Sequence, residues 1–131
     1  MDPKRIRYVI PSYQRPKQLQ AKTLNFLKHH KIPNEDISIV LRSDDEHLSE
    51  YQALGKGYLF HITKRKGIGN THNYITEHFD EGQFIVEIDD DLTDIIDNKK
   101  NSVDFNAECV KMFNIMIHMG ASYGGTYQCD N

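Results

Sequence analysis

Residues Phe84-Ile85-Val86-Glu87-Ile88-Asp89-Asp90-Asp91 form an apolar run that ends in three consecutive carboxylates. The apolar part is short, rich in β-branched and aromatic residues and preceded by Gly82, so it predicts a strand over residues 84–88. In an open α/β sheet, ligands bind beyond the carboxyl ends of the strands. The acidic run therefore stands where such a fold would bind its ligand.

The chain before this stretch alternates strand-like and helix-like segments. Short β-branched or aromatic runs predict strands at Arg5–Ile10, Ile37–Leu41 and Tyr58–Ile62. Apolar residues at helical spacing predict helices at Lys17–His30, Asp45–Leu54 and Gly69–Phe79. Alternation of strands and helices with short connections predicts an α/β fold, with a mainly parallel sheet and helices on both of its faces.

The pattern changes after Asp91. Residues 93–104 are polar and predict a loop, Phe105–Met119 has helical periodicity, and Ala121–Tyr127 is expected to begin another strand. A length of 131 residues suits one domain. We expect residues 1–92 to form its ligand-binding half and residues 93–131 to begin a second half.

Composition excludes several functional classes. The net charge is −3 and there is no long basic run, which argues against nonspecific binding of nucleic acid. The apolar stretches fall far short of the roughly 20 residues that a membrane span needs, and the N-terminus has no signal-peptide core. Cys109 and Cys129 lack metal-ligand spacing and are expected to be free thiols in a reducing compartment. Together these features predict a cytoplasmic protein.

The three carboxylates favour a metal site. Alternate residues of an extended chain face the same way, so Asp89 and Asp91 are expected to point together, with Asp90 on the other side. Like charges at this spacing repel, and a bound divalent cation removes that cost. Mg²⁺ or Mn²⁺ takes one or two carboxylates and completes its shell with phosphate oxygens and water. The alternative is a solvated acidic turn, continued by Asp94 and Asp97, but the position after an apolar strand favours metal.

The segment Pro11-Ser12-Tyr13-Gln14-Arg15-Pro16 joins the first strand to the first helix at the same edge of the sheet. Tyr13 is suited to stack on a nucleobase, Arg15 to bind phosphate, and Ser12 to donate to ribose or phosphate. A plain turn followed by a helix start explains Pro and Ser equally well. Only the other motifs favour the nucleotide site.

Three motifs in order resemble GT-A glycosyltransferases. Val9–Arg15, followed by Leu19 and Thr23-Leu24, resembles their opening strand and Pro-Ser/Thr-Tyr-x-Arg segment, and Lys66–Asn73 resembles their G-x-x-x-A-R-N helix entry. Asp89-Asp90-Asp91 falls where the family has its metal-binding D-x-D motif. The whole is also similar to glycosyltransferase domains of large DNA viruses, including chloroviruses, which implies a viral protein of the host cytoplasm.

The resemblance implies a Rossmann-like GT-A fold and a role for each motif. The first loop would hold the nucleotide, the end of the second strand would meet its base, and the helix entry would reach the nucleotide or its diphosphate. The first two aspartates would face the nucleotide, and the last would bind Mn²⁺ or Mg²⁺ with help from the first. The implied nucleotide-binding residues are Pro11, Ser12, Tyr13, Arg15, Arg42, Asp44, Lys66, Gly67, Ile68, Asp89 and Asp90, and the implied metal ligands are Asp91 and Asp89.

Two departures from the family pattern limit what carries over. His72 stands where the family's helix entry has arginine, which weakens the match to diphosphate binding. The chain also ends about forty residues after the D-x-D motif, whereas GT-A domains continue into an acceptor pocket. The resemblance thus implies that part of the acceptor half is lacking. The catalytic base is unknown, with Asp94 and Asp130 as acidic candidates of equal standing.

The expected function is metal-dependent transfer of a sugar from a nucleoside diphosphate sugar, with UDP favoured, to a glycan or glycoprotein acceptor. The alternative is a non-catalytic nucleotide-sugar-binding module or a truncated glycosyltransferase fragment. A sugar nucleotidyltransferase ranks lower, because the loop over residues 11–16 contains no glycine. A relative that glycosylates DNA bases is a further alternative, and the acidic net charge argues against it.

Overall fold

The structure is a computed structural model that describes residues 6–64, 84–93 and 104–119. The chain divides into two compact units, Met1–Asp94 and Ile95–Asn131. Each unit is described by itself.

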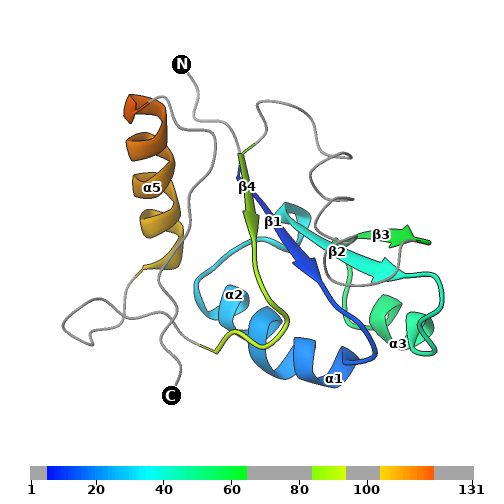
Figure 1. The fold of residues 1–131 in the computed structure, drawn as a ribbon. Coiled ribbons are helices and arrows are strands. Elements are labelled where there is room, and N and C mark those ends of the chain that lie inside the picture. The colour runs from blue at the N-terminus through cyan, green and yellow to red at the C-terminus, as the bar shows by residue number, and fades with distance from the viewer. Residues whose placement is uncertain (1–5, 65–83, 94–103, 120–131) are drawn as a thin grey trace. The chain divides into compact units, whose positions relative to one another are not determined.

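The first unit is built on a four-stranded sheet in which every described pairing is parallel (Figure 1). Its strands are β1 (Ile6–Pro11), β2 (Ile37–Arg42), β3 (Leu59–Thr63) and β4 (Phe84–Glu87), in the order β3-β2-β1-β4. The predictions of an α/β fold and of a parallel sheet are confirmed, and the predicted strand ends lie within one residue of the observed ones.

The sheet is apolar on both faces, as expected of parallel strands. Register places Tyr8 beside Ile37 and Ile10 beside Ile39, and all four side chains are buried. On the opposite face, a second cluster joins Val9, Val40 and Ile85.

Residues 16–29, between β1 and β2, form one continuous helical segment. It comprises α1 (Pro16–Leu19), the π-helical turn η1 (Gln20–Leu24) and α2 (Asn25–His29), so the single helix predicted over 17–30 contains a π turn. Pro16 stands in the first turn, where its missing N–H costs nothing. The apolar stripe of this helix is buried at Leu19, Leu24, Phe26 and Leu27.

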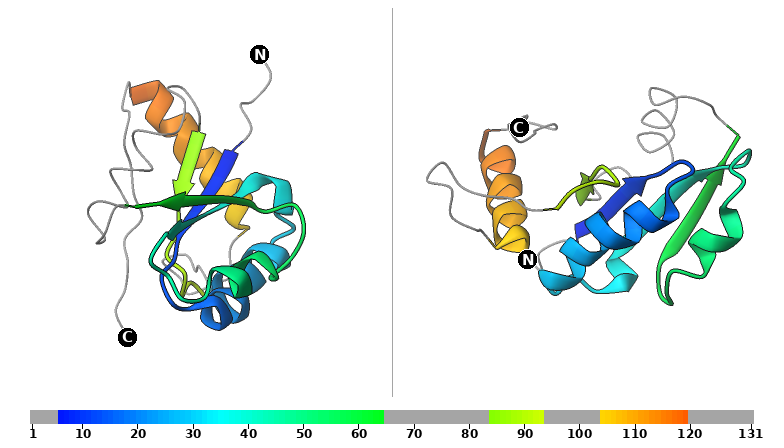
Figure 2. Two further views of the ribbon diagram at one scale, coloured as in Figure 1. Left: turned by 90° about the vertical axis from the view of Figure 1, so that its right-hand side faces the viewer. Right: turned by 90° about the horizontal axis from the view of Figure 1, so that it is seen from below.

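A 3₁₀ turn, η2 (Asn34–Asp36), leads into β2, and α3 (Leu48–Gln52) follows β2. The helix α3 is shorter than the predicted span of 45–54. Asp45 accounts for the later start, because its carboxylate accepts a hydrogen bond from the backbone N–H of His47, the residue just before the helix. Figure 2 shows α1, α2 and α3 on the same side of the sheet. The helix predicted over 69–79 lies outside the described residues.

The second unit contains α5 (Phe105–Met119), which confirms the helix predicted there. Asp104 caps it, since its carboxylate accepts from the Ala107 backbone at 3.0 Å. The strand expected over 121–127 lies outside the described residues. None of the helices that the structure describes has the length and hydrophobicity needed to cross a membrane.

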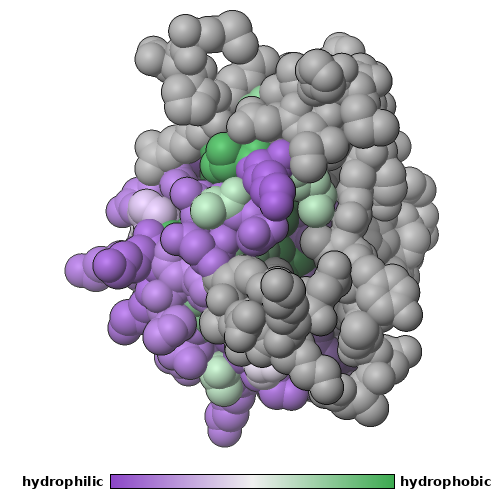
Figure 3. All heavy atoms as spheres, turned by 90° about the vertical axis from the view of Figure 1, so that its left-hand side faces the viewer, coloured by the Kyte–Doolittle hydropathy of each residue, from purple (hydrophilic) through white to green (hydrophobic). Residues whose placement is uncertain are grey.

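Side chains on the face shown in Figure 3 are mostly hydrophilic where the structure describes them, with smaller hydrophobic areas between them. This agrees with a charged fraction of 27% in the whole sequence. Large apolar side chains exposed among the described residues include Leu59 and Ile62 on β3 and Val110 on α5.

Candidate functional site

The strand order creates a topological switch point at β1. The chain moves outward from β1 to β2 and β3, then returns to the other side of β1 to form β4. The strand order therefore reverses between β1 and β4. Open α/β sheets bind ligands at such a point. The loop after β1 and the acidic residues after β4 meet there.

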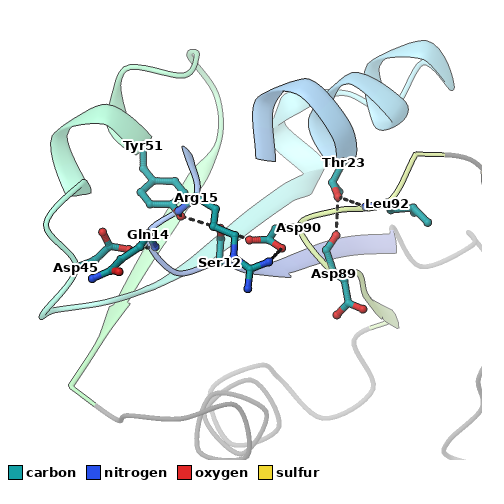
Figure 4. Close-up of polar contacts among 9 residues, drawn as sticks. All are labelled: Ser12, Gln14, Arg15, Thr23, Asp45, Tyr51, Asp89, Asp90 and Leu92. Carbon is teal, nitrogen blue, oxygen red and sulfur yellow. Dashed lines mark hydrogen bonds and ion pairs between the residues drawn. The ribbon is translucent and has the colours of Figure 1, made fainter. Parts of the chain in front are cut away.

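The contact between these segments is a hydrogen bond from Ser12 to Asp90 (Figure 4). The Ser12 hydroxyl donates to Asp90 Oδ2 at 2.7 Å, and it also lies 2.7 Å from the hydroxyl of Tyr51. All three residues are buried. The hydroxyl of Ser12, expected to face ribose or phosphate, is thus engaged with Asp90 inside the protein.

Arg15 places a positive charge beside Asp90. Its side chain is 55% exposed, and its Nη1 lies 3.7 Å from Asp90 Oδ1. Its backbone N–H donates to the Tyr51 hydroxyl at 2.9 Å, which fixes the residue at the start of α1. The residue is therefore anchored through its backbone, while its side chain remains more than half exposed.

The three aspartates alternate in exposure. Ile88 and Asp90 are buried, whereas Asp89 and Asp91 are exposed. Figure 4 shows the Asp89 side chain directed away from that of Asp90. Within the residues that the structure describes, neither Asp89 nor Asp91 uses its carboxylate in a hydrogen bond or ion pair. These two side chains are the ones available to a cation.

The turn that carries the aspartates is tied to the π turn of the helix. Thr23, fully buried in η1, donates its hydroxyl proton to the Asp89 carbonyl oxygen at 2.5 Å and accepts from the Leu92 N–H at 2.9 Å. Asp90 and Asp91 are the central residues of this turn, so the Thr23 hydroxyl holds both ends of the segment that presents them.

The exposed carboxylates could supply part of the ligand shell of a divalent ion. Across residues 6–64, 84–93 and 104–119, no group of three or more His, Cys, Asp or Glu side chains is placed to hold a metal. Proteins usually bind Mg²⁺ or Mn²⁺ through one or two carboxylates when phosphate oxygens and water provide the other ligands. The two exposed carboxylates at this edge match that number. Residues Asp89 and Asp91 therefore fit an ion that arrives with a diphosphate, and do not form a closed protein cage.

An aromatic and charged cluster lies at the carboxyl ends of β1 and β2. The Arg42 guanidinium stacks 3.9 Å from the centre of the Tyr13 ring and makes two hydrogen bonds to Asp44, at 3.1 and 2.8 Å. The hydrogen bond to Asp44 raises the pKa of Arg42 above its ordinary value. The structure thus brings together the three residues expected to meet the base, and one face of Tyr13 is covered by Arg42.

Asp45, next to this cluster, binds backbone groups of two loops. It is buried, and its two carboxylate oxygens accept from the backbone N–H groups of Gln14 and His47, each at 2.8 Å. Gln14 has a φ of 56°, in the left-handed region. Asp45 therefore joins the loop after β2 to the loop after β1 and holds the latter in an otherwise unfavourable conformation.

Sequence reasoning did not identify Tyr51, Thr23 or the loop-holding role of Asp45. Buried hydroxyls on amphipathic helices give a weak signal, because Tyr and Thr are common helix residues and their partners here lie far away in the chain. Of the predicted site residues, Lys66, Gly67 and Ile68 lie outside the described residues. Pro11 ends β1 and is partly exposed.

Comparison of the chain with protein-family models, with curated proteins and with solved structures finds no match. The geometry of the sheet edge and the sequence motifs that meet there are the features that bear on function.

Proposed function

We propose that this chain is a metal-dependent glycosyltransferase of the Rossmann-like GT-A type. It would transfer a sugar from a nucleoside diphosphate sugar, with UDP-sugars favoured, to a glycan or glycoprotein acceptor. The observation that carries the proposal is the meeting of Arg15, buried Asp90 and the exposed carboxylates of Asp89 and Asp91 at the switch point of a parallel sheet. A nucleoside diphosphate bound with a divalent ion needs this combination of positive and negative groups.

Each group has a distinct part in the proposed complex. The exposed tip of Arg15 donates charge-assisted hydrogen bonds to phosphate oxygens. The Tyr13 ring offers the base a stacking surface, with Arg42 and Asp44 beside it. Asp89 and Asp91 would hold Mn²⁺ or Mg²⁺, which when bound stabilises negative charge on the departing diphosphate. The catalytic base is not assigned.

The geometry gives the proposal a sharp test. Because the ion would gain only two carboxylates from the described residues, its affinity should depend on the nucleotide. Titration calorimetry should show weak binding of Mn²⁺ alone and at least tenfold tighter binding in the presence of UDP. Asp91→Asn should reduce that joint binding about tenfold or more, since it removes one charged ligand.

Glu35→Gln is the matched control. It also removes one negative charge, but Glu35 precedes β2 and so lies at the opposite edge of the sheet. Equal binding of Mn²⁺ and UDP by wild type and Asp91→Asn would contradict the proposed metal site. Release of UDP from UDP-sugars by the wild-type chain would distinguish a transferase from a nucleotide-sugar-binding module.

A further inference from the structure

Tyr51 reaches the site from α3, an element that carries none of the residues expected to bind a ligand. Its side chain is completely buried. The hydroxyl lies 2.7 Å from Ser12 Oγ and 2.9 Å from the backbone nitrogen of Arg15. Figure 4 shows the ring directed at the loop after β1. One phenolic oxygen thus meets two residues of that loop.

Counting protons fixes the direction of every hydrogen bond in this group. The Arg15 N–H can only donate, so the Tyr51 oxygen accepts from it. The single hydroxyl proton of Ser12 goes to Asp90. The contact between Ser12 and Tyr51 must then be a donation from the tyrosine. The chain of donors runs from Arg15 N–H through Tyr51 and Ser12 and ends on the Asp90 carboxylate.

We propose that Tyr51 is a positioning residue of the ligand site. Through Ser12 it orients the Asp90 carboxylate, and through the Arg15 backbone it fixes the base of the arginine that lies beside that carboxylate. The inference rests on the proposed function, because it treats Arg15 and Asp90 as groups of the nucleotide site. It adds a residue on α3 that controls both groups without touching the nucleotide itself.

Burial supports this donor role. Desolvation raises the pKa of Tyr51 above its ordinary value, so the phenol keeps its proton and can donate throughout the neutral range. Phenylalanine would fill the same space, but it has no hydroxyl group and so cannot form these hydrogen bonds. Loss of the Tyr51 hydroxyl removes two hydrogen bonds: the one that Tyr51 donates to Ser12 and the one that it accepts from the Arg15 N–H.

The test uses Tyr51→Phe, with Tyr58→Phe as the matched control. Tyr58 is half-buried and packs its ring against Phe60. Calorimetry with Mn²⁺ and UDP should show about fivefold weaker binding for Tyr51→Phe, the usual effect of one neutral hydrogen bond, and no change for Tyr58→Phe. Amide exchange followed by NMR should be at least about fivefold faster at Arg15 in Tyr51→Phe alone.

A double-mutant cycle separates positioning from general support of the fold. In a Ser12→Ala background, Tyr51 is disconnected from Asp90, so Tyr51→Phe should cost clearly less than fivefold in affinity. The same loss of affinity in both backgrounds, or unchanged amide exchange at Arg15, would overturn the inference.

If wild type binds neither Mn²⁺–UDP nor UDP, the proposed function fails. Urea unfolding of Tyr51→Phe, Asp90→Ala and the double variant then measures the interaction free energy between the two residues. An interaction free energy of zero would show that the chain of hydrogen bonds does not exist.

Discussion

The Thr23 hydroxyl stands between the Asp89 carbonyl and the Leu92 N–H, where a tight turn would form its own hydrogen bond. Residue 89 and residue 92 are three apart, so their backbone groups are the pair that closes a β-turn. Here both backbone groups bond to the Thr23 hydroxyl, which comes from the π turn of the helix. Because π turns within α-helices often occur at functional sites, the position of Thr23 agrees with a turn built to present the aspartates.

Thr23→Val should destabilise the protein by about 1–2 kcal/mol, because it removes the hydroxyl that bonds to both the Asp89 carbonyl and the Leu92 N–H in a partly buried turn. Valine keeps the shape, so little of the loss comes from packing. Thr23→Ser keeps the hydroxyl and loses one methyl group, at a cost of about 1 kcal/mol. Urea unfolding of the three proteins measures both effects. A larger loss for serine than for valine would show that Thr23 acts mainly through packing.

Asp45→Ala should lower the free energy of unfolding by about 3 kcal/mol. The substitution removes two charge-assisted hydrogen bonds to backbone N–H groups, those of Gln14 and His47. Asp44→Ala, one residue earlier, breaks an exposed ion pair with Arg42 and should cost about 0–1 kcal/mol. Denaturant unfolding compares the two. Equal losses would contradict the assignment of Asp45 as the residue that joins the loops.

Tyr13→Ala should weaken binding of UDP in the presence of Mn²⁺ about tenfold, since stacking of one base on an aromatic ring contributes about 1–3 kcal/mol. Tyr13→Phe keeps the ring and should bind within about twofold of wild type. Titration calorimetry provides the measurement. If alanine binds as tightly as phenylalanine, the base does not stack on Tyr13.

Lys31→Gly should stabilise the protein by about 0.5–1 kcal/mol. Lys31 has a φ of 61° just after α2, and its N–H and that of Ile32 bond to the carbonyls of Lys28 and Leu27 in a Schellman motif. Glycine adopts this conformation without the cost that a side chain imposes. Lys28→Gly, inside the helix, should destabilise by about 1 kcal/mol. Thermal unfolding should therefore shift in opposite directions for the two lysines.

His47 should titrate above its ordinary pKa of 6.5. The hydrogen bond to Glu50, at 2.8 Å, is the main cause, and the charges of Glu50, Asp45 and Glu46 add to it. Because the folded-state pKa is raised, the stabilising contribution is fully present below pH 6.5 and is lost as the pH rises through the raised value. NMR titration of the ring should show Glu50→Gln lowering this pKa, and no change would refute the cause given.

Local sequence features were enough to predict the fold class and most element ends. A strand such as 84–88 is recognised from its own composition, and the helix over 105–119 from its own periodicity. The shortened α3 and the π turn at residues 20–24 were not predicted. The later start of α3 follows from the hydrogen bond between Asp45 and the His47 backbone. The π turn contains Thr23, whose hydroxyl bonds to the acidic turn far along the chain.

The carboxylates after one apolar strand and the Ser-Tyr-x-Arg loop after another can be recognised from the sequence alone, because each feature lies within a few residues. The tertiary structure establishes that β4 pairs with β1, which brings Ser12 to Asp90 across 78 residues of chain. It also selected Asp90 as the buried aspartate and left Asp89 and Asp91 exposed. Short-range periodicity cannot encode these choices, since they follow from strand order and from buried hydroxyls that find partners far away in the chain.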